Sequence, residues 1–138
     1  MAVVTDVLYT GKNRCQATHG PSKNTIVTDL PVDNGGKGEA FSPTDLVAAA
    51  LGSCAITVMD LAARKRGWDL SGTRVHVTKE MAAQPVRRIG TLRLNLTMPA
   101  TLKLSPEDRG FLEQAAKKCP VLQSLHPDVQ VVTTFKWL

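Results

Sequence analysis

The stretch that decides the fold is SPTDLVAAALGSCAITVMDLAARKRG, residues 42–67, because signals for a helix stand at both of its ends. Ser42 is a residue type that caps helices, and Pro43 suits the first helical position, where no backbone N–H is needed. Asp45 follows Ser42 by three residues, as the acid does in a capping box, although its side chain is shorter than that of Glu. The sequence therefore predicts a helix that begins at Pro43.

The end of the same stretch carries the opposite signals. The basic run 64–66 suits the negative end of a helix, and Gly67 suits the position just beyond it. The resulting helix, residues 43–66, would be about 36 Å long. Its portion 46–59 is apolar on almost every side, with Cys54 in the middle, so a sheet and a further partner are expected to cover it.

The chain before this helix is rich in strand and turn signals. Apolar and β-branched residues predict strands over 3–9, 13–18 and 25–28, separated by glycine- and proline-containing turns. The polar segment PVDNGGKG, residues 31–38, is expected to be a connector that is mobile or allows close backbone approach. It lacks the spacing of a phosphate-binding loop.

The chain after the long helix adds two alternating strands, a second helix and a last strand. Alternation of apolar and polar residues is typical of half-buried antiparallel strands. The expected elements are strands 73–81 and 90–98, a helix capped by Ser105 and running through Lys118, one further turn at 121–125, and a strand over 129–137. Strands and helices are partly segregated, which favours an α+β fold with mainly antiparallel sheet, in a single domain over 1–138.

Composition narrows the class of protein. The chain has 138 residues, 43% of them hydrophobic and 21% charged, as in an ordinary globular domain. Its longest near-apolar run, Leu46 to Met59, is shorter than the roughly 20 residues that span a bilayer, so no membrane helix is expected. The N-terminus does not read as a secretory signal. The net charge of +5 is dispersed, and no nucleic-acid-binding motif is present, so a solvated basic surface is expected.

Three cysteines, Cys15, Cys54 and Cys119, are the residues with chemical potential. They form no C-x-x-C pair and no zinc-ligand spacing, and the histidines are isolated, so neither a metal nor a cofactor is expected. An odd, sparse set favours a reducing, cytoplasmic compartment. By residue type alone, the favoured interpretation of each cysteine is a small buried hydrophobe, most strongly for Cys15.

Several motifs together resemble one family. They are GKGEAFSPTDLVAAALGSCAITVMDLAARKRGWDLSG, the pattern KEM-x-x-x-P-x-RRI, the segment DRGFLEQAAKKCPVLQSLHPDV, and FKW near the end. The chain resembles, from about residue 7 to 137, the OsmC/Ohr family of osmotically inducible and organic-hydroperoxide-resistance proteins. The resemblance implies an intertwined homodimer in which mainly antiparallel sheets wrap two long central helices, with active sites at the subunit interface.

The resemblance also implies thiol-dependent peroxidase activity. Cys54 matches the cysteine that attacks the peroxide and becomes a sulfenic acid, and Cys119 matches the cysteine that resolves it to a disulfide. An external thiol or dithiol would then restore both thiols. Arg14 best matches the activating arginine, with Arg87 and Arg88 as alternative sources of positive charge.

One position departs from the family pattern. In the organic-hydroperoxide branch a glutamate that holds the arginine stands where this chain has Thr44. Asp45 and Glu39 are the candidate replacements, although Asp45 also suits helix capping and Glu39 a solvated loop. The departure indicates a general OsmC-like branch. It also leaves open a non-catalytic dimer on the same scaffold that senses redox state or binds a small ligand.

Overall fold

The computed structural model describes all residues, 1–138, and has a mixed α/β fold. The chain divides into two compact units, Met1–Val47 and Ala48–Leu138, and the long helix begins in the first and continues in the second. Each unit is described by itself below.

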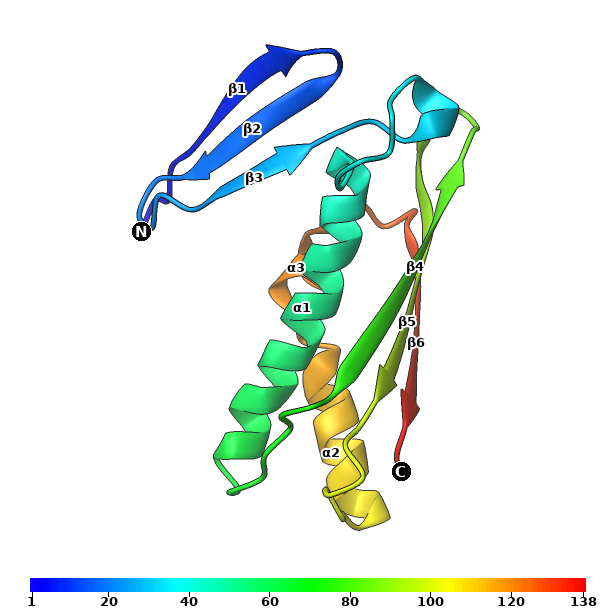
Figure 1. Cartoon of the computed structure of the whole chain (residues 1–138). Coiled ribbons are helices and arrows are strands. Elements are labelled where there is room, and N and C mark those ends of the chain that lie inside the picture. Colours follow the sequence, from blue (N-terminus) through cyan, green and yellow to red (C-terminus); the bar gives the residue numbers. More distant parts are fainter. The chain divides into compact units, whose positions relative to one another are not determined.

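The N-terminal unit contains a three-stranded antiparallel sheet in the order β1-β2-β3 (Figure 1). Its strands are β1 (Thr5–Gly11), β2 (Arg14–His19) and β3 (Thr25–Thr28). They lie within two residues of the predicted bounds, and β3 coincides with its prediction. Lys12 and Asn13, at the tip of the β1–β2 hairpin, take left-handed conformations with φ of 55° and 65°.

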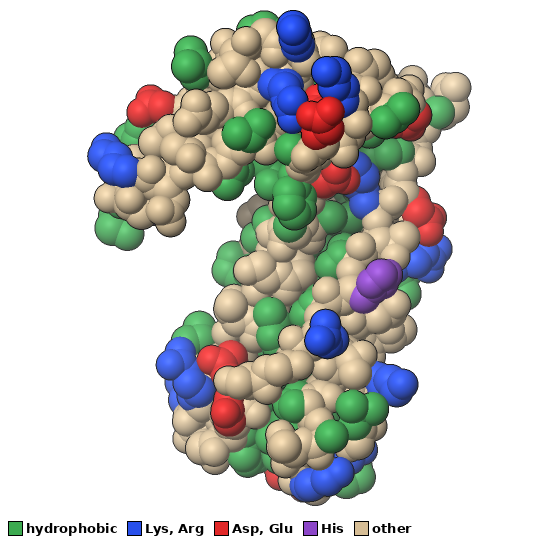
Figure 2. Space-filling view, in the orientation of Figure 1, with side chains coloured by type: hydrophobic (Ala, Val, Ile, Leu, Met, Phe, Trp, Pro, Cys, Tyr) green, Lys and Arg blue, Asp and Glu red, His purple; other side chains and the backbone are tan.

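Few side chains of this sheet are buried. The only buried residues of the N-terminal unit are the polar Thr28, Asp29 and Ser42. Large apolar side chains are exposed on both faces of the sheet, and green side chains are visible among the charged ones on the molecular surface (Figure 2). Those exposed by about half or more include Val7, Leu8, Tyr9, Ile26 and Val27.

The segment after β3 is a closed loop. A short 3-10 helix, η1 (Val32–Asn34), lies inside it, where only a connector was expected. The backbone N–H of Asp29 donates to the carbonyl of Phe41 at 3.1 Å, which closes the loop at its base. A side chain at Gly36 would place its Cβ 1.9 Å from the carbonyl oxygen of Leu30, so the predicted close backbone approach is confirmed.

The long helix α1 (Pro43–Arg64) starts as predicted. The Ser42 hydroxyl accepts the Asp45 N–H at 3.1 Å, and the Asp45 carboxylate accepts the Ser42 N–H at 2.9 Å. These reciprocal bonds are those of a capping box, which satisfies two N–H groups that would otherwise have no partner. The helix ends at Arg64, two residues before the predicted end.

The sequence predicted no membrane helix, but helix α1 is longer and more apolar than that prediction assumed. It is 22 residues long with a mean hydropathy of 1.9 over its best window, which suffices to cross a membrane by length and composition alone. The prediction was based on a single uninterrupted apolar run and so underestimated the length of the apolar helix. This is weak evidence for a membrane span, because core helices pass the same test; one third of that window is buried.

The C-terminal unit packs α1 and α2 (Pro106–Ala116) on one face of a second three-stranded sheet (Figure 1). The strands are β4 (Arg74–Ala82), β5 (Arg88–Thr97) and β6 (Gln130–Lys136), in the order β4-β5-β6. A one-turn helix, α3 (Pro120–Ser124), follows α2.

The core of this unit is aliphatic, as composition and alternation predict. Leu92, Leu94 and Leu96 of β5 point to the helices, while the intervening Arg93 and Asn95 are exposed. A Cβ at Gly52 of α1 would lie 2.8 Å from the Cγ2 of Val77, so the glycine lets the helix lie close to β4. The helices contribute Leu51, Ala55, Met59, Leu112 and Ala116 to the same core.

One strand pairing is parallel. β6 runs parallel to β5, whereas the other three pairings are antiparallel, so "mainly antiparallel" describes the sheets correctly. A parallel pair needs a long crossover, which the segment containing α2 and α3 supplies.

Candidate functional site

Two groups of reactive or charged side chains emerge, one in each unit. In the N-terminal unit, Arg14 at the start of β2 contacts two carboxylates. Its Nη1 lies 3.1 Å from Oε2 of Glu39, and its Nη2 lies 3.9 Å from Oδ2 of Asp29. Glu39, one of the two acids proposed to hold the arginine, therefore pairs with Arg14 in the structure.

Asp29 is the more constrained of these two acids. Its side chain is 1% exposed, against 55% for Glu39. Oδ1 accepts the N–H of Leu30 at 2.8 Å, and Oδ2 accepts the N–H of Glu39 at 3.2 Å. The Glu39 bond is the main cause that lowers the pKa of Asp29, and the Leu30 bond and the charge of Arg14 lower it further, against burial.

Sequence reasoning missed Asp29. The signal was present, since Asp29 is the only charged residue in the segment Ile26–Val32. A lone carboxylate among apolar residues that becomes buried needs partners. Its partners come from the loop closure and from β2, and these contacts cannot be located from the sequence.

The acid next to the helix start has a different set of bonds. The Asp45 carboxylate accepts the N–H of Ser42, as its capping position predicted. The hydroxyl groups of Thr44 and Ser42 lie 3.2 Å apart. Of the two candidate replacements, Glu39 forms a salt bridge with Arg14, and Asp45 forms the capping bond described above.

In the C-terminal unit, Cys54 and Cys119 lie together. Cys54 is half-buried within α1, whereas Cys119 is fully buried where α2 gives way to α3. The two side chains lie near enough for the Cys54 thiol to influence the pKa of Cys119, and no disulfide joins them. Burial, and after it the neighbouring Cys54 thiol, raises the pKa of the Cys119 thiol. Cys119 therefore stays protonated to a higher pH than an exposed thiol does.

The remaining cysteine and arginines lie elsewhere in their units. Cys15 lies in β2, opposite Tyr9 and Thr28 on the neighbouring strands. Arg87 and Arg88 flank the β4–β5 turn, where Arg88 donates to the carbonyl of Gln84 at 3.4 Å. No group of three or more His, Cys, Asp or Glu side chains is arranged to hold a metal ion.

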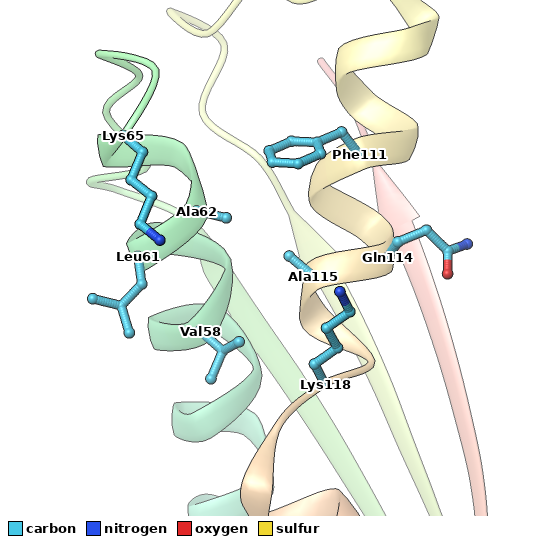
Figure 3. A pocket seen from close by; sticks show the side chains of 8 residues that line it. All are labelled: Val58, Leu61, Ala62, Lys65, Phe111, Gln114, Ala115 and Lys118. Atoms are coloured by element: carbon cyan, nitrogen blue, oxygen red, sulfur yellow. The ribbon is translucent and has the colours of Figure 1, made fainter.

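A groove runs between α1 and α2. It has a volume of about 290 Å³, and Val58 and Ala62 of α1 point toward Phe111 and Ala115 of α2 (Figure 3). Val58 follows Cys54 by four residues, so both lie on one face of the helix. The full lining consists of Val58, Leu61, Ala62, Lys65, Phe111, Gln114, Ala115 and Lys118.

Comparison with known proteins agrees with this architecture. The model of the family described as OsmC-like protein matches residues 36–134. A solved structure from Psychrobacter arcticus 273-4, of a proposed osmotic stress induced and detoxification response protein, is 42% identical. It covers 95% of this chain and 93% of its own, with a TM-score of 0.89. No protein with a curated description matches.

More distant structures share the fold. The organic hydroperoxide resistance protein OsmC of Legionella pneumophila is 17% identical, with coverage of 99% and 97% and a TM-score of 0.79. An organic hydroperoxide resistance protein of Elizabethkingia anophelis is 15% identical, with coverage of 100% and 97% and a TM-score of 0.78. The family match over most of the chain, together with the 42% identical structure, shows that this protein belongs to the OsmC-like family.

Proposed function

We propose that the protein is a thiol-dependent hydroperoxide reductase that uses Cys54 as its nucleophile and Cys119 as its resolving cysteine. The observation that carries the proposal is the proximity of the two thiols, one half-exposed and the other fully buried. Family membership, with relatives named for organic hydroperoxide resistance, supports it.

The first step is the reduction of the peroxide. The Cys54 thiolate attacks the distal oxygen, an S–O bond forms, and the O–O bond breaks. The alkoxide leaves and takes up the proton that Cys54 released, so the products are an alcohol and a sulfenic acid. A protonated Cys119 beside Cys54 would favour this step, because its S–H can donate a hydrogen bond to the sulfur that must carry negative charge.

The second step restores the protein. The sulfur of Cys119 attacks the sulfenic sulfur of Cys54, water leaves, and a disulfide forms. An external dithiol then reduces that disulfide by exchange and is itself oxidised. Because the two thiols are neighbours, we expect the disulfide to need little movement of either cysteine.

Arg14 would supply the positive charge that favours the thiolate. A cation near a thiol lowers the pKa of that thiol, and a guanidinium can also orient a peroxide oxygen. The salt bridges to Glu39 and Asp29 hold the arginine in a defined arrangement despite Thr44 at the family's glutamate position. We propose that these three residues form the charged part of the site.

The groove between α1 and α2 would select the substrate. Its apolar floor suits an alkyl tail, and the shared face of Cys54 and Val58 would place the tail beside the nucleophile. We therefore propose organic hydroperoxides as preferred over hydrogen peroxide.

We also propose that the active protein is a homodimer in a reducing, cytoplasmic compartment. The exposed face of α1 carries small residues that allow close approach of another helix, among them Ala49, Ala50 and Ser53. Both faces of the N-terminal sheet expose apolar side chains that a second copy would cover.

The test is turnover with excess dithiol and an organic hydroperoxide. Cys54→Ser should reduce consumption to the rate without protein, and Cys119→Ser should allow oxidation of Cys54 but slow recycling. Cys15→Ser, the matched control, should stay close to the wild type. Consumption by Cys54→Ser at the wild-type rate would exclude the mechanism.

The same assay separates the enzyme from a redox sensor or ligand-binding dimer. A sensor would consume about one peroxide per protein and stop, whereas an enzyme consumes many as long as dithiol remains.

A further inference from the structure

We propose that Asp29 is a positioning residue for Arg14, a buried carboxylate that fixes the guanidinium and its second partner, Glu39, in one arrangement. The inference rests on the proposed function, in which Arg14 favours the Cys54 thiolate. It assigns the role of the missing glutamate at position 44 to an acid from a different part of the chain.

A single carboxylate oxygen links the members of this cluster. Oδ2 of Asp29 accepts the backbone N–H of Glu39 at 3.2 Å and lies 3.9 Å from Nη2 of Arg14. The side chain of Glu39 in turn contacts Nη1 of Arg14 at 3.1 Å. Asp29 therefore acts on the guanidinium directly and also through the backbone of the residue that forms its salt bridge.

Burial decides which acid sets the position. Asp29 is 1% exposed and accepts two backbone N–H groups, so its carboxylate has one orientation. Glu39 is 55% exposed, and an ion pair of that kind contributes little because side-chain entropy and solvent oppose it. The geometry of Arg14 is thus expected to depend on Asp29 more than on Glu39.

The closed loop keeps Asp29 in place. Its own N–H donates to the carbonyl of Phe41 at 3.1 Å, and Thr28 forms a β-bridge with Phe41. Nε of Arg14 is buried without a hydrogen-bond partner, so the guanidinium is held through its two terminal nitrogens. Loss of the Asp29 charge would leave one of these nitrogens without a carboxylate.

A purely structural role, in which Asp29 only closes the loop, makes a different prediction. If Asp29 acts through Arg14, its replacement should have no further effect on Cys54 once Arg14 is gone. If Asp29 only stabilises the loop, its replacement should have the same effect with or without Arg14. A double-mutant cycle separates the two cases.

The experiment measures alkylation of Cys54 by iodoacetamide across a pH series, followed through the mass of the Cys54 peptide. Asp29→Asn should slow alkylation at neutral pH by about tenfold, because less of Cys54 would be present as the reactive thiolate. In Arg14→Ala protein the same substitution should change the rate by less than about twofold. Asp69→Asn, which removes another hydrogen-bonded carboxylate from a C-terminal loop, is the control and should have no effect.

Two results would overturn the inference. One is an equal slowing by Asp29→Asn in the presence and absence of Arg14, and the other is no slowing in the wild-type background. Peroxide turnover is measured in parallel on the same samples. If the alkylation rates show that the Asp29 effect depends on Arg14 but no peroxide is turned over, the proposed function alone is wrong. If turnover is normal but the Asp29 effect does not depend on Arg14, the role of Asp29 alone is wrong.

A second variant keeps the test decisive if Asp29→Asn does not fold. Glu39→Gln removes the exposed salt bridge and leaves Asp29 unchanged. The Nε–H resonance of Arg14, observed by nitrogen-15 NMR, should then keep its position and slow solvent exchange. Loss of that ordered signal in Glu39→Gln would show that Glu39 orients the arginine, and the inference would be wrong.

Discussion

The C-terminal unit buries leucine, alanine and methionine side chains from two helices and a sheet, whereas the N-terminal unit buries only Thr28, Asp29 and Ser42. The first set resembles the core of an independent domain, stabilised by removal of apolar surface from water. The second set is held by hydrogen bonds and charge, while the apolar side chains of its sheet stay exposed. The difference suggests that the C-terminal unit carries its own stability and the N-terminal unit depends on a covering surface.

The largest expected effect is on the free energy of unfolding, which tests whether the two units differ in how they are stabilised. Leu94→Ala removes a fully buried side chain and should cost about 2–5 kcal/mol of unfolding free energy at any protein concentration. Leu8→Ala removes a side chain that is 65% exposed in the single chain. Because we expect a second copy to cover this sheet, its destabilisation should change with protein concentration. Urea unfolding at two concentrations measures both.

One outcome would contradict this difference between the two units. If Leu8→Ala destabilised the protein as strongly as Leu94→Ala, and equally at both concentrations, the N-terminal sheet would have an apolar core of its own.

A smaller effect concerns the chemistry assigned to each unit. Val58→Gln places a polar group in the apolar groove and should lower kcat/KM for cumene hydroperoxide about tenfold more than for hydrogen peroxide. Glu39→Gln alters only the charged cluster, so it should lower both values by the same modest factor. Equal effects of Val58→Gln on the two peroxides would remove the groove from substrate binding.

The smallest effect is a contrast in pH dependence. The pKa of Asp29 is lowered in the fold, so its stabilisation is present above the ordinary carboxyl value of about 3.9 and is lost as pH falls through the folded-state pKa. The pKa of Cys119 is raised, so its contribution is present below about 8.5 and is lost as pH rises toward the folded-state value.

Melting temperatures across the pH range check both signs. Asp29→Asn should flatten the acid side of the profile and leave the alkaline side unchanged, and Cys119→Ala should do the reverse. A change on the alkaline side for Asp29→Asn, or on the acid side for Cys119→Ala, would contradict the directions given for these two pKa values.

Local signals in the sequence predicted most of the elements. The capping box at Ser42 and the alternation in β5 act between residues close in sequence, so their consequences are visible without a structure. The C-terminal end of α1 differed from the prediction by two residues because basic residues also suit the turn that follows a helix. The parallel pairing of β5 with β6 was not predicted, since pairing direction depends on how α2 and α3 carry the chain between them.

The candidate site was only partly accessible to sequence reasoning. Cys54 and Cys119 were paired through the family resemblance, and in the structure the two side chains are neighbours. Glu39 was one of two acids considered for Arg14. Asp29 was missed because its importance arises from a bond to a residue ten positions later and from proximity to β2, neither of which leaves a local pattern.

The complete burial of Cys119 constrains how the proposed cycle must end. In the oxidised protein an incoming reductant would reach only the sulfur of Cys54, so the mixed disulfide would form there and Cys119 would be the leaving group. Peroxide and reductant would then use the same opening in turn and compete for it. Such an enzyme would show ping-pong kinetics, with inhibition by excess of either substrate.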